Sequence, residues 1–120
     1  MPIRFFRSLK HALRGLAYTF RYEKNFRIEV IVGLFVVASL FLFDLATWER
    51  VALVGMVGWV IVMELLNTVV ERVINIVRPR NHPYPGIIKD IMASVVLVSS
   101  LTALCVAMII VVTHISSRGI

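Results

Sequence analysis

The chain has 120 residues, 59% of them hydrophobic, and a formal net charge of +6. Its mean hydropathy is +0.88, and soluble domains are nearer to about 45–50% apolar, so this composition indicates that lipid is the solvent. We expect one membrane domain over residues 1–120 with no separate nucleotide-binding or catalytic domain, so any chemistry must be done by membrane helices and their short flanks.

The first 22 residues combine apolar and basic side chains at helical spacing. Basic residues fill much of the space between the apolar positions, which are Ile3, Phe6, Leu9, Leu13, Leu16, Ala17 and Phe20. This pattern predicts a basic amphipathic helix over residues 1–22 that lies in the cytoplasmic headgroup layer. Two roles remain open for it, a simple anchor and a cover over an active site.

Three apolar runs follow. Only Glu29 is charged between residues 28 and 43, and residues 51–63 and 91–113 carry no charge. About 20 helical residues cross the hydrocarbon, and lipid cannot satisfy an open backbone, so each run is expected to be a helix. We therefore predict an all-α membrane protein with transmembrane helices at about 27–47, 50–77 and 90–113.

The distribution of Lys and Arg predicts the orientation. Residues 1–27 carry seven, residues 44–50 one, residues 67–90 four, and the tail after His114 one. Because short cytoplasmic loops are enriched in Lys and Arg, the N-terminus and the second loop are expected in the cytoplasm. The basic residues flank the spans, so the positive charge does not call for a nucleic-acid partner.

The second span carries a polar stripe made of Glu64, Asn67, Glu71 and Asn75. Their spacing of three, four and four places them on one helix face. A charge in mid-membrane costs about 2.5–3.5 kcal/mol on insertion scales, so such residues usually face a partner or a wet cavity. The stripe therefore indicates a functional site, and the alternative is a hydrogen-bonded seam between helices.

More charged residues are expected at the cytoplasmic ends of the spans. Glu23 and Glu29 flank the start of the first span, and Lys89 and Asp90 begin the third. Carboxylates at this level suit Mg²⁺, which typically uses one or two protein carboxylates and leaves other positions to water and phosphates. Lys89 suits a phosphate contact. The alternative for Lys89 and Asp90 is helix capping.

Soluble nucleotide-binding motifs are absent from the sequence, which contains neither G-x-x-x-x-G-K-[ST] nor G-x-G-x-x-G. The segment HPYPG at residues 82–86 is rich in turn-forming residues. It predicts a loop between the second and third spans.

Four segments together resemble the prokaryotic diacylglycerol kinase and undecaprenol kinase family. They are YEKNFR at 22–27, ELLNTVVE at 64–71, HP at 82–83 and KDIMA at 89–93. The resemblance covers nearly the whole chain, and its specific part is an E-x-x-N-T-x-x-E block followed about 20 residues later by K-D-x-x-A. It implies a homotrimeric lipid kinase in the bacterial plasma (inner) membrane, with several spans and a cytoplasmic N-terminus.

The implied reaction transfers the γ-phosphoryl group of Mg-ATP to the hydroxyl of undecaprenol or diacylglycerol at the cytoplasmic face. By this resemblance Glu23 and Glu71 bind Mg²⁺ and the nucleotide phosphates. Glu64 is the base that takes the hydroxyl proton, and Asn67 positions the reacting groups. The remaining implied nucleotide contacts are Lys89 and Asp90. Such a reaction needs mostly positioning and charge neutralisation, which small helices can supply.

Two further residues carry weaker implications. Glu29 falls where the diacylglycerol kinase branch also has an acid, whereas residues 23–26 and 82–83 look like the undecaprenol kinase branch. Asn75 stands where the family usually has Asp, so the site lacks one charge. If that Asp helps to hold a second metal ion or the adenine end of the nucleotide, the affinity for ATP is lower in this chain. The substrate expectation leans to undecaprenol.

A rival hypothesis comes from a different class of protein. A small oligomeric transporter can couple proton or cation movement through a buried acid such as Glu64. A transporter needs that acid at the midplane and reachable from both faces, whereas the acids here cluster toward the cytoplasmic side with Lys89.

Overall fold

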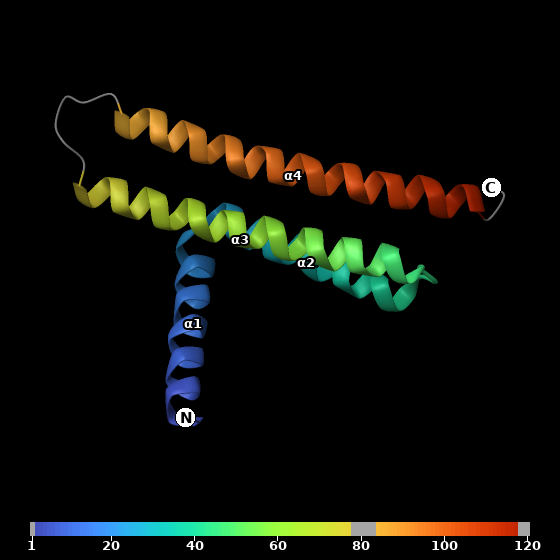
Figure 1. Ribbon diagram of the computed structural model, residues 1–120, viewed down its shortest axis with the longest axis horizontal. Coiled ribbons are helices and arrows are strands. Elements are labelled where there is room, and N and C mark those ends of the chain that lie inside the picture. Colours follow the sequence, from blue (N-terminus) through green and yellow to red (C-terminus); the bar gives the residue numbers. More distant parts are fainter. Residues whose placement is uncertain (1, 78–83, 118–120) are drawn as a thin grey trace.

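The computed structural model describes residues 2–77 and 84–117 (Figure 1). Within these ranges the chain forms helices and no strand: α1 (Pro2–Tyr22), α2 (Lys24–Leu42), α3 (Thr47–Val77) and α4 (Tyr84–Ser117). Two whole helices, α2 and α3, and the Pro85–Ser117 part of α4 are long and apolar enough to cross a membrane. The expected all-α architecture, an amphipathic helix followed by three apolar spans, is confirmed.

The first helix runs crosswise to the other three, which lie along one another (Figure 1). The central span is α3, because it packs against both α2 and α4. Large apolar side chains of α1, including Ile3, Phe6 and Leu13, are exposed, because no other part of the described chain covers them. When the spans cross a bilayer, a crosswise helix with an exposed apolar side is suited to lie in the headgroup layer.

The lengths of the spans place the end of α3 beyond the start of α2. Helix α2 has 19 residues and α3 has 31, a difference of 12. The two helices are joined by a short connection at their other ends, so the extra length of α3 lies on the α1 side (Figure 1). At 1.5 Å per residue this excess is about 18 Å. The last turns of α3 therefore project beyond the start of α2, on the side of the spans where α1 lies (Figure 1).

Small residues and one polar pair hold the spans together. A Cβ atom added to Gly33 of α2 would lie 2.9 Å from Val57 Cγ1 of α3, so this glycine permits the close approach of the two helices. Between α3 and α4, the Trp59 indole N–H donates a hydrogen bond to Ser99 Oγ at 3.1 Å. A small core far from α1 contains Leu40, Leu53 and Ile110.

The start of α3 is fixed by Glu49, whose carboxylate lies at the third helical position. Its Oε1 accepts a hydrogen bond from the backbone N–H of Ala46 at 2.7 Å, and the side chain is buried. This is the backbone half of a capping box. Glu49 is therefore a structural acid at the end of α3 opposite to the polar stripe.

The start of α4 differs from the sequence-based expectation. Tyr84, Pro85 and Gly86 form its first turn rather than a loop, whereas His82 and Pro83 lie outside the described residues. The first turn of a helix tolerates Pro because its N–H has no partner within the helix there. Lys89 and Asp90 therefore lie in the second turn, and the helix-capping interpretation of this pair is wrong.

Candidate functional site

The corner between α1 and α2 consists of one residue, Glu23. Its backbone is extended, with φ −114° and ψ 109°, and its N–H donates to the Thr19 carbonyl at 2.8 Å. From the first turn of α2, Arg27 Nη1 donates to the carbonyls of Phe20 and Arg21 at 2.9 and 2.8 Å. A basic side chain on the last carbonyls stabilises a helix end. These bonds fix the position from which the Glu23 carboxylate extends.

An arginine of α3 reaches that carboxylate. Arg72 Nη2 donates to Glu23 Oε1 at 2.6 Å, and Arg72 Nε donates to the Tyr18 hydroxyl at 3.2 Å. The guanidinium also lies over the Tyr18 ring, 5.8 Å from its centroid. This charge-assisted contact ties the end of α1 and the corner to α3, and it brings Glu23 to the level of Glu71, which precedes Arg72 in the helix.

The polar stripe of α3 runs from a buried end to an exposed one. Glu64 is only 3% exposed, Asn67 and Glu71 are partly buried, and Asn75 is exposed. Asn67 Nδ2 donates a long hydrogen bond to Glu71 Oε1 at 3.4 Å. Glu64 and Glu71 are seven positions apart, which corresponds to about 10 Å along the helix axis. Glu71 is the one nearer to the end of α3 that projects beyond α2.

Glu64 is the most enclosed acid of the stripe. Its Oε2 is buried and has no hydrogen-bond partner among the described residues. A buried polar atom without a partner is rare and costly, so Glu64 is better suited to receive a proton or a ligand than to support packing.

At the exposed end of the stripe, α4 joins the site through Lys89. Its Nζ donates to Asn75 Oδ1 at 2.9 Å, which brings together a residue of the stripe and the predicted phosphate contact. The neighbouring Asp90 is exposed. The neutral amide positions the ammonium without cancelling its charge, so Lys89 stays a net positive group beside the acids.

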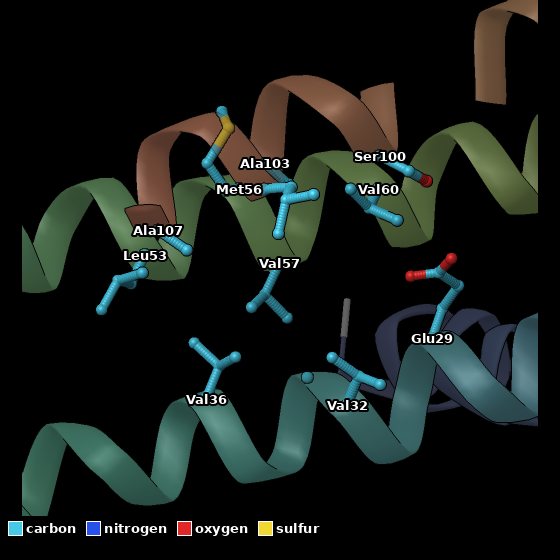
Figure 2. Close-up of a pocket in the computed structure, with 12 residues that line it drawn as sticks. Glu29, Val32, Val36, Leu53, Met56, Val57, Val60, Ser100, Ala103 and Ala107 are labelled. Atoms are coloured by element: carbon cyan, nitrogen blue, oxygen red, sulfur yellow. The ribbon is translucent and has the colours of Figure 1, made fainter. Parts of the chain in front are cut away.

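A groove of about 230 Å³ lies between α2, α3 and α4 (Figure 2). Apart from Glu29 and Ser100, its lining residues are apolar; Val32, Val36 and Val57 are among them. Figure 2 shows Glu29 at one end of this lining. The groove therefore joins an apolar part of the bundle to the Glu29 carboxylate.

The donor set fits a hard cation with few protein ligands. No three acidic, His or Cys side chains among the described residues are placed to hold one metal ion together. Mg²⁺ uses one or two carboxylates and completes its shell with water and substrate phosphates, so Glu71 and Glu23 are enough in number. Among the described residues Glu71 accepts one long hydrogen bond, from Asn67, while Glu23 is held by Arg72.

The pattern of the sequence did not single out Arg72 and Tyr18. In the sequence analysis, Arg72 was one of the four Lys and Arg residues counted in residues 67–90. Tyr18 was only one position of the predicted amphipathic helix over residues 1–22. One signal in the sequence could have pointed to Arg72. It is a charged residue that directly follows Glu71 but lies off the polar stripe, among apolar neighbours. Its partner Glu23 lies 49 positions away, so local spacing does not reveal the pair.

Comparisons with known proteins agree with this arrangement. The family model described as prokaryotic diacylglycerol kinase matches residues 10–111, which include every candidate residue from Glu23 to Asp90. The undecaprenol kinase of Bacillus subtilis is 31% identical over 107 residues, covering 89% of this chain and 87% of that protein. A diacylglycerol kinase of Synechocystis sp. is 32% identical over 100 residues, covering 82% of this chain and 57% of that protein.

A third relative, a diacylglycerol kinase of Pseudomonas aeruginosa, is 28% identical over 87 residues, with 72% of this chain and 71% of that protein covered. None of these findings supports the transporter hypothesis. The family match extends from the middle of α1 into the last turns of α4, so it covers the surface helix and all three spans. The chain therefore belongs to the prokaryotic diacylglycerol kinase family and is a membrane lipid kinase.

Proposed function

We propose that this kinase transfers the γ-phosphoryl group of ATP to a lipid hydroxyl at the membrane surface next to α1. The observation that carries this proposal is the change in exposure along the polar stripe of α3. Asn75, which accepts a hydrogen bond from Lys89, is exposed, whereas Glu64 is buried. ATP comes from water and the lipid from the bilayer. A site with an exposed, charged end suits ATP, and a buried acid further along the same helix suits the hydroxyl of a lipid.

Glu64 is the proposed general base. It takes the proton of the lipid hydroxyl as that oxygen bonds to the γ-phosphorus and the bond to the ADP oxygen breaks. Its buried, unpartnered Oε2 supports this role, because a base must be free to accept a proton. Asn67, one turn nearer to Glu71, is proposed to position the reacting groups. The apolar groove ending at Glu29 supports access from the bilayer side.

Glu71 and Glu23 are the proposed Mg²⁺ ligands, and they also contact the nucleotide through the metal. Bound Mg²⁺ would neutralise charge on the phosphate oxygens during transfer. Lys89 is proposed to contact the phosphates directly, since its ammonium lies beside the exposed end of the stripe. Asp90, the next residue of α4, is proposed to contact another part of the nucleotide.

The proposed location is the bacterial plasma membrane with the N-terminus in the cytoplasm. The excess of Lys and Arg in residues 1–27 and 67–90 supports that orientation, and ATP is available on that side. The proposed assembly is a homotrimer, as family membership implies. An open face on α3 supports self-association: a Cβ atom added to Gly55 or Gly58 would meet no atom of this chain within 4 Å.

The proposed substrate is undecaprenol rather than diacylglycerol. The Bacillus subtilis relative, whose name is undecaprenol kinase, is covered over 87% of its length and supports this preference. The test is the initial rate of phosphate transfer from Mg-ATP in mixed micelles that contain one lipid alcohol at the same mole fraction. We expect faster phosphorylation of undecaprenol. Equal turnover of both lipids would contradict the preference, and no turnover of either would contradict the proposed function.

The substitution Asn75→Asp tests the departure from the family pattern. We expect KM for ATP to fall several-fold, because the carboxylate can help to hold the Mg²⁺ that accompanies ATP while it keeps an acceptor for Lys89. A salt bridge at an exposed position contributes only about 0–1 kcal/mol, so thermal stability should change little. KM for ATP, measured beside the thermal midpoint, checks this. A rise in KM would show that the uncompensated charge of Lys89 matters more than the acid.

A further inference from the structure

The contact between Arg72 and Glu23 joins a cation of the chain to a proposed metal ligand. The guanidinium Nη2 lies 2.6 Å from Glu23 Oε1, and the two side chains are 36% and 22% exposed. A second nitrogen, Nε, is bonded to the Tyr18 hydroxyl. The guanidinium is thus held from two sides, in a fixed position next to the carboxylate.

The same position is unfavourable for a second cation. A divalent ion bound to Glu23 would lie within a few ångströms of the guanidinium, where two positive charges repel each other strongly. Mg²⁺ also requires near-octahedral geometry with oxygen atoms at about 2.0–2.1 Å. Glu23 Oε1 already accepts the arginine hydrogen bond, so an ion on either carboxylate oxygen would lie close to the guanidinium. Either the ion binds more weakly or Arg72 moves away.

We propose that Arg72 is a built-in counter-ion that competes with the divalent cation for Glu23 and thereby sets the metal affinity of the site. The proposal rests on the proposed function, in which Glu23 is a metal ligand. Without metal, Arg72 neutralises the corner carboxylate and keeps it directed toward α3. Metal binding then exchanges one positive partner of Glu23 for another, so the carboxylate has a positive partner in both states.

The test is the binding of Mn²⁺ alone to the purified full-length protein in detergent micelles, followed by the electron paramagnetic resonance signal of free Mn²⁺. We expect Arg72→Gln to bind Mn²⁺ roughly tenfold more tightly than wild type, which corresponds to about 1.4 kcal/mol. Arg72→Lys keeps the charge and should bind within about threefold of wild type. Arg72→Met removes the charge but keeps an apolar stem, and should reproduce the gain if the Gln variant does not fold.

Two further variants separate the possible failures. Glu23→Gln should weaken Mn²⁺ binding, and adding Arg72→Gln to it should give no gain, since the competition acts through Glu23. If Glu23→Gln leaves the affinity unchanged, Glu23 is not a metal ligand and that part of the proposed function is wrong. If it weakens binding but neither Arg72→Gln nor Arg72→Met strengthens it, the counter-ion proposal alone is overturned.

Discussion

The substitution Glu64→Gln should lower kcat for lipid phosphorylation about 10²–10⁴-fold, the usual contribution of a general base. Gln has nearly the same shape and keeps hydrogen-bonding atoms, so it removes the proton acceptor with little change in packing. KM for ATP should stay near the wild-type value, because the proposed nucleotide contacts lie nearer to the exposed end of α3. Initial rates in mixed micelles, with ATP and lipid varied separately, measure both constants.

Glu49 provides a matched control on the same helix. Like Glu64 it is a buried acid, but its carboxylate accepts the Ala46 N–H at the opposite end of α3. Glu49→Gln should therefore retain wild-type kcat, with at most a modest loss of stability from the weakened cap. If Glu64→Gln were as active as wild type, or if both variants lost activity equally, Glu64 would not be the base.

The second large effect is expected from Glu71→Ala. Loss of a direct metal ligand should weaken Mg²⁺ binding by more than about a hundredfold, since removing even an indirect partner of a ligand typically costs 10–100-fold. Activity should be almost absent at ordinary Mg²⁺ concentrations and recover in part at high Mg²⁺. A titration of the lipid kinase rate with Mg²⁺ at saturating ATP and lipid measures this dependence.

Asp44→Asn is the control for Glu71→Ala. Asp44 is an exposed acid in the connection between α2 and α3, at the opposite end of the spans from α1. Its substitution also removes one negative charge, yet its Mg²⁺ dependence should match wild type. Identical Mg²⁺ curves for Glu71→Ala and Asp44→Asn would rule out Glu71 as a metal ligand.

The sequence predicts the helices well because lipid imposes simple rules. A long uncharged run must be helical in hydrocarbon, and apolar residues at helical spacing define α1. The same periodicity of about 100° per residue correctly places the four stripe residues along one helix. Their order of burial, with Glu64 deepest and Asn75 exposed, depends on how the helices pack, because the last turns of α3 project beyond the start of α2.

Other features depend on contacts between distant segments. Arg72 pairs with Glu23 where α3 meets the corner between α1 and α2, and Lys89 pairs with Asn75 where α4 meets α3. The start of α4 was misplaced because Pro85 and Gly86 are turn formers in general, whereas the first turn of a helix accepts Pro without losing a hydrogen bond. Glu49 falls between the predicted spans and was not singled out, because its capping role depends on the short connection before α3.

The most direct test of the central claim is transfer of radioactive phosphate from γ-labelled ATP to lipid by the purified protein. Wild type and Glu71→Ala are compared in the same undecaprenol-containing micelles with Mg²⁺, after both are shown to have the same helical content. We predict that wild type labels the lipid, that removing Mg²⁺ stops the labelling, and that Glu71→Ala labels it less than about a hundredth as fast. Equal labelling by the two proteins, or none by wild type with either undecaprenol or diacylglycerol, would contradict the assignment of this carboxylate site to lipid phosphorylation.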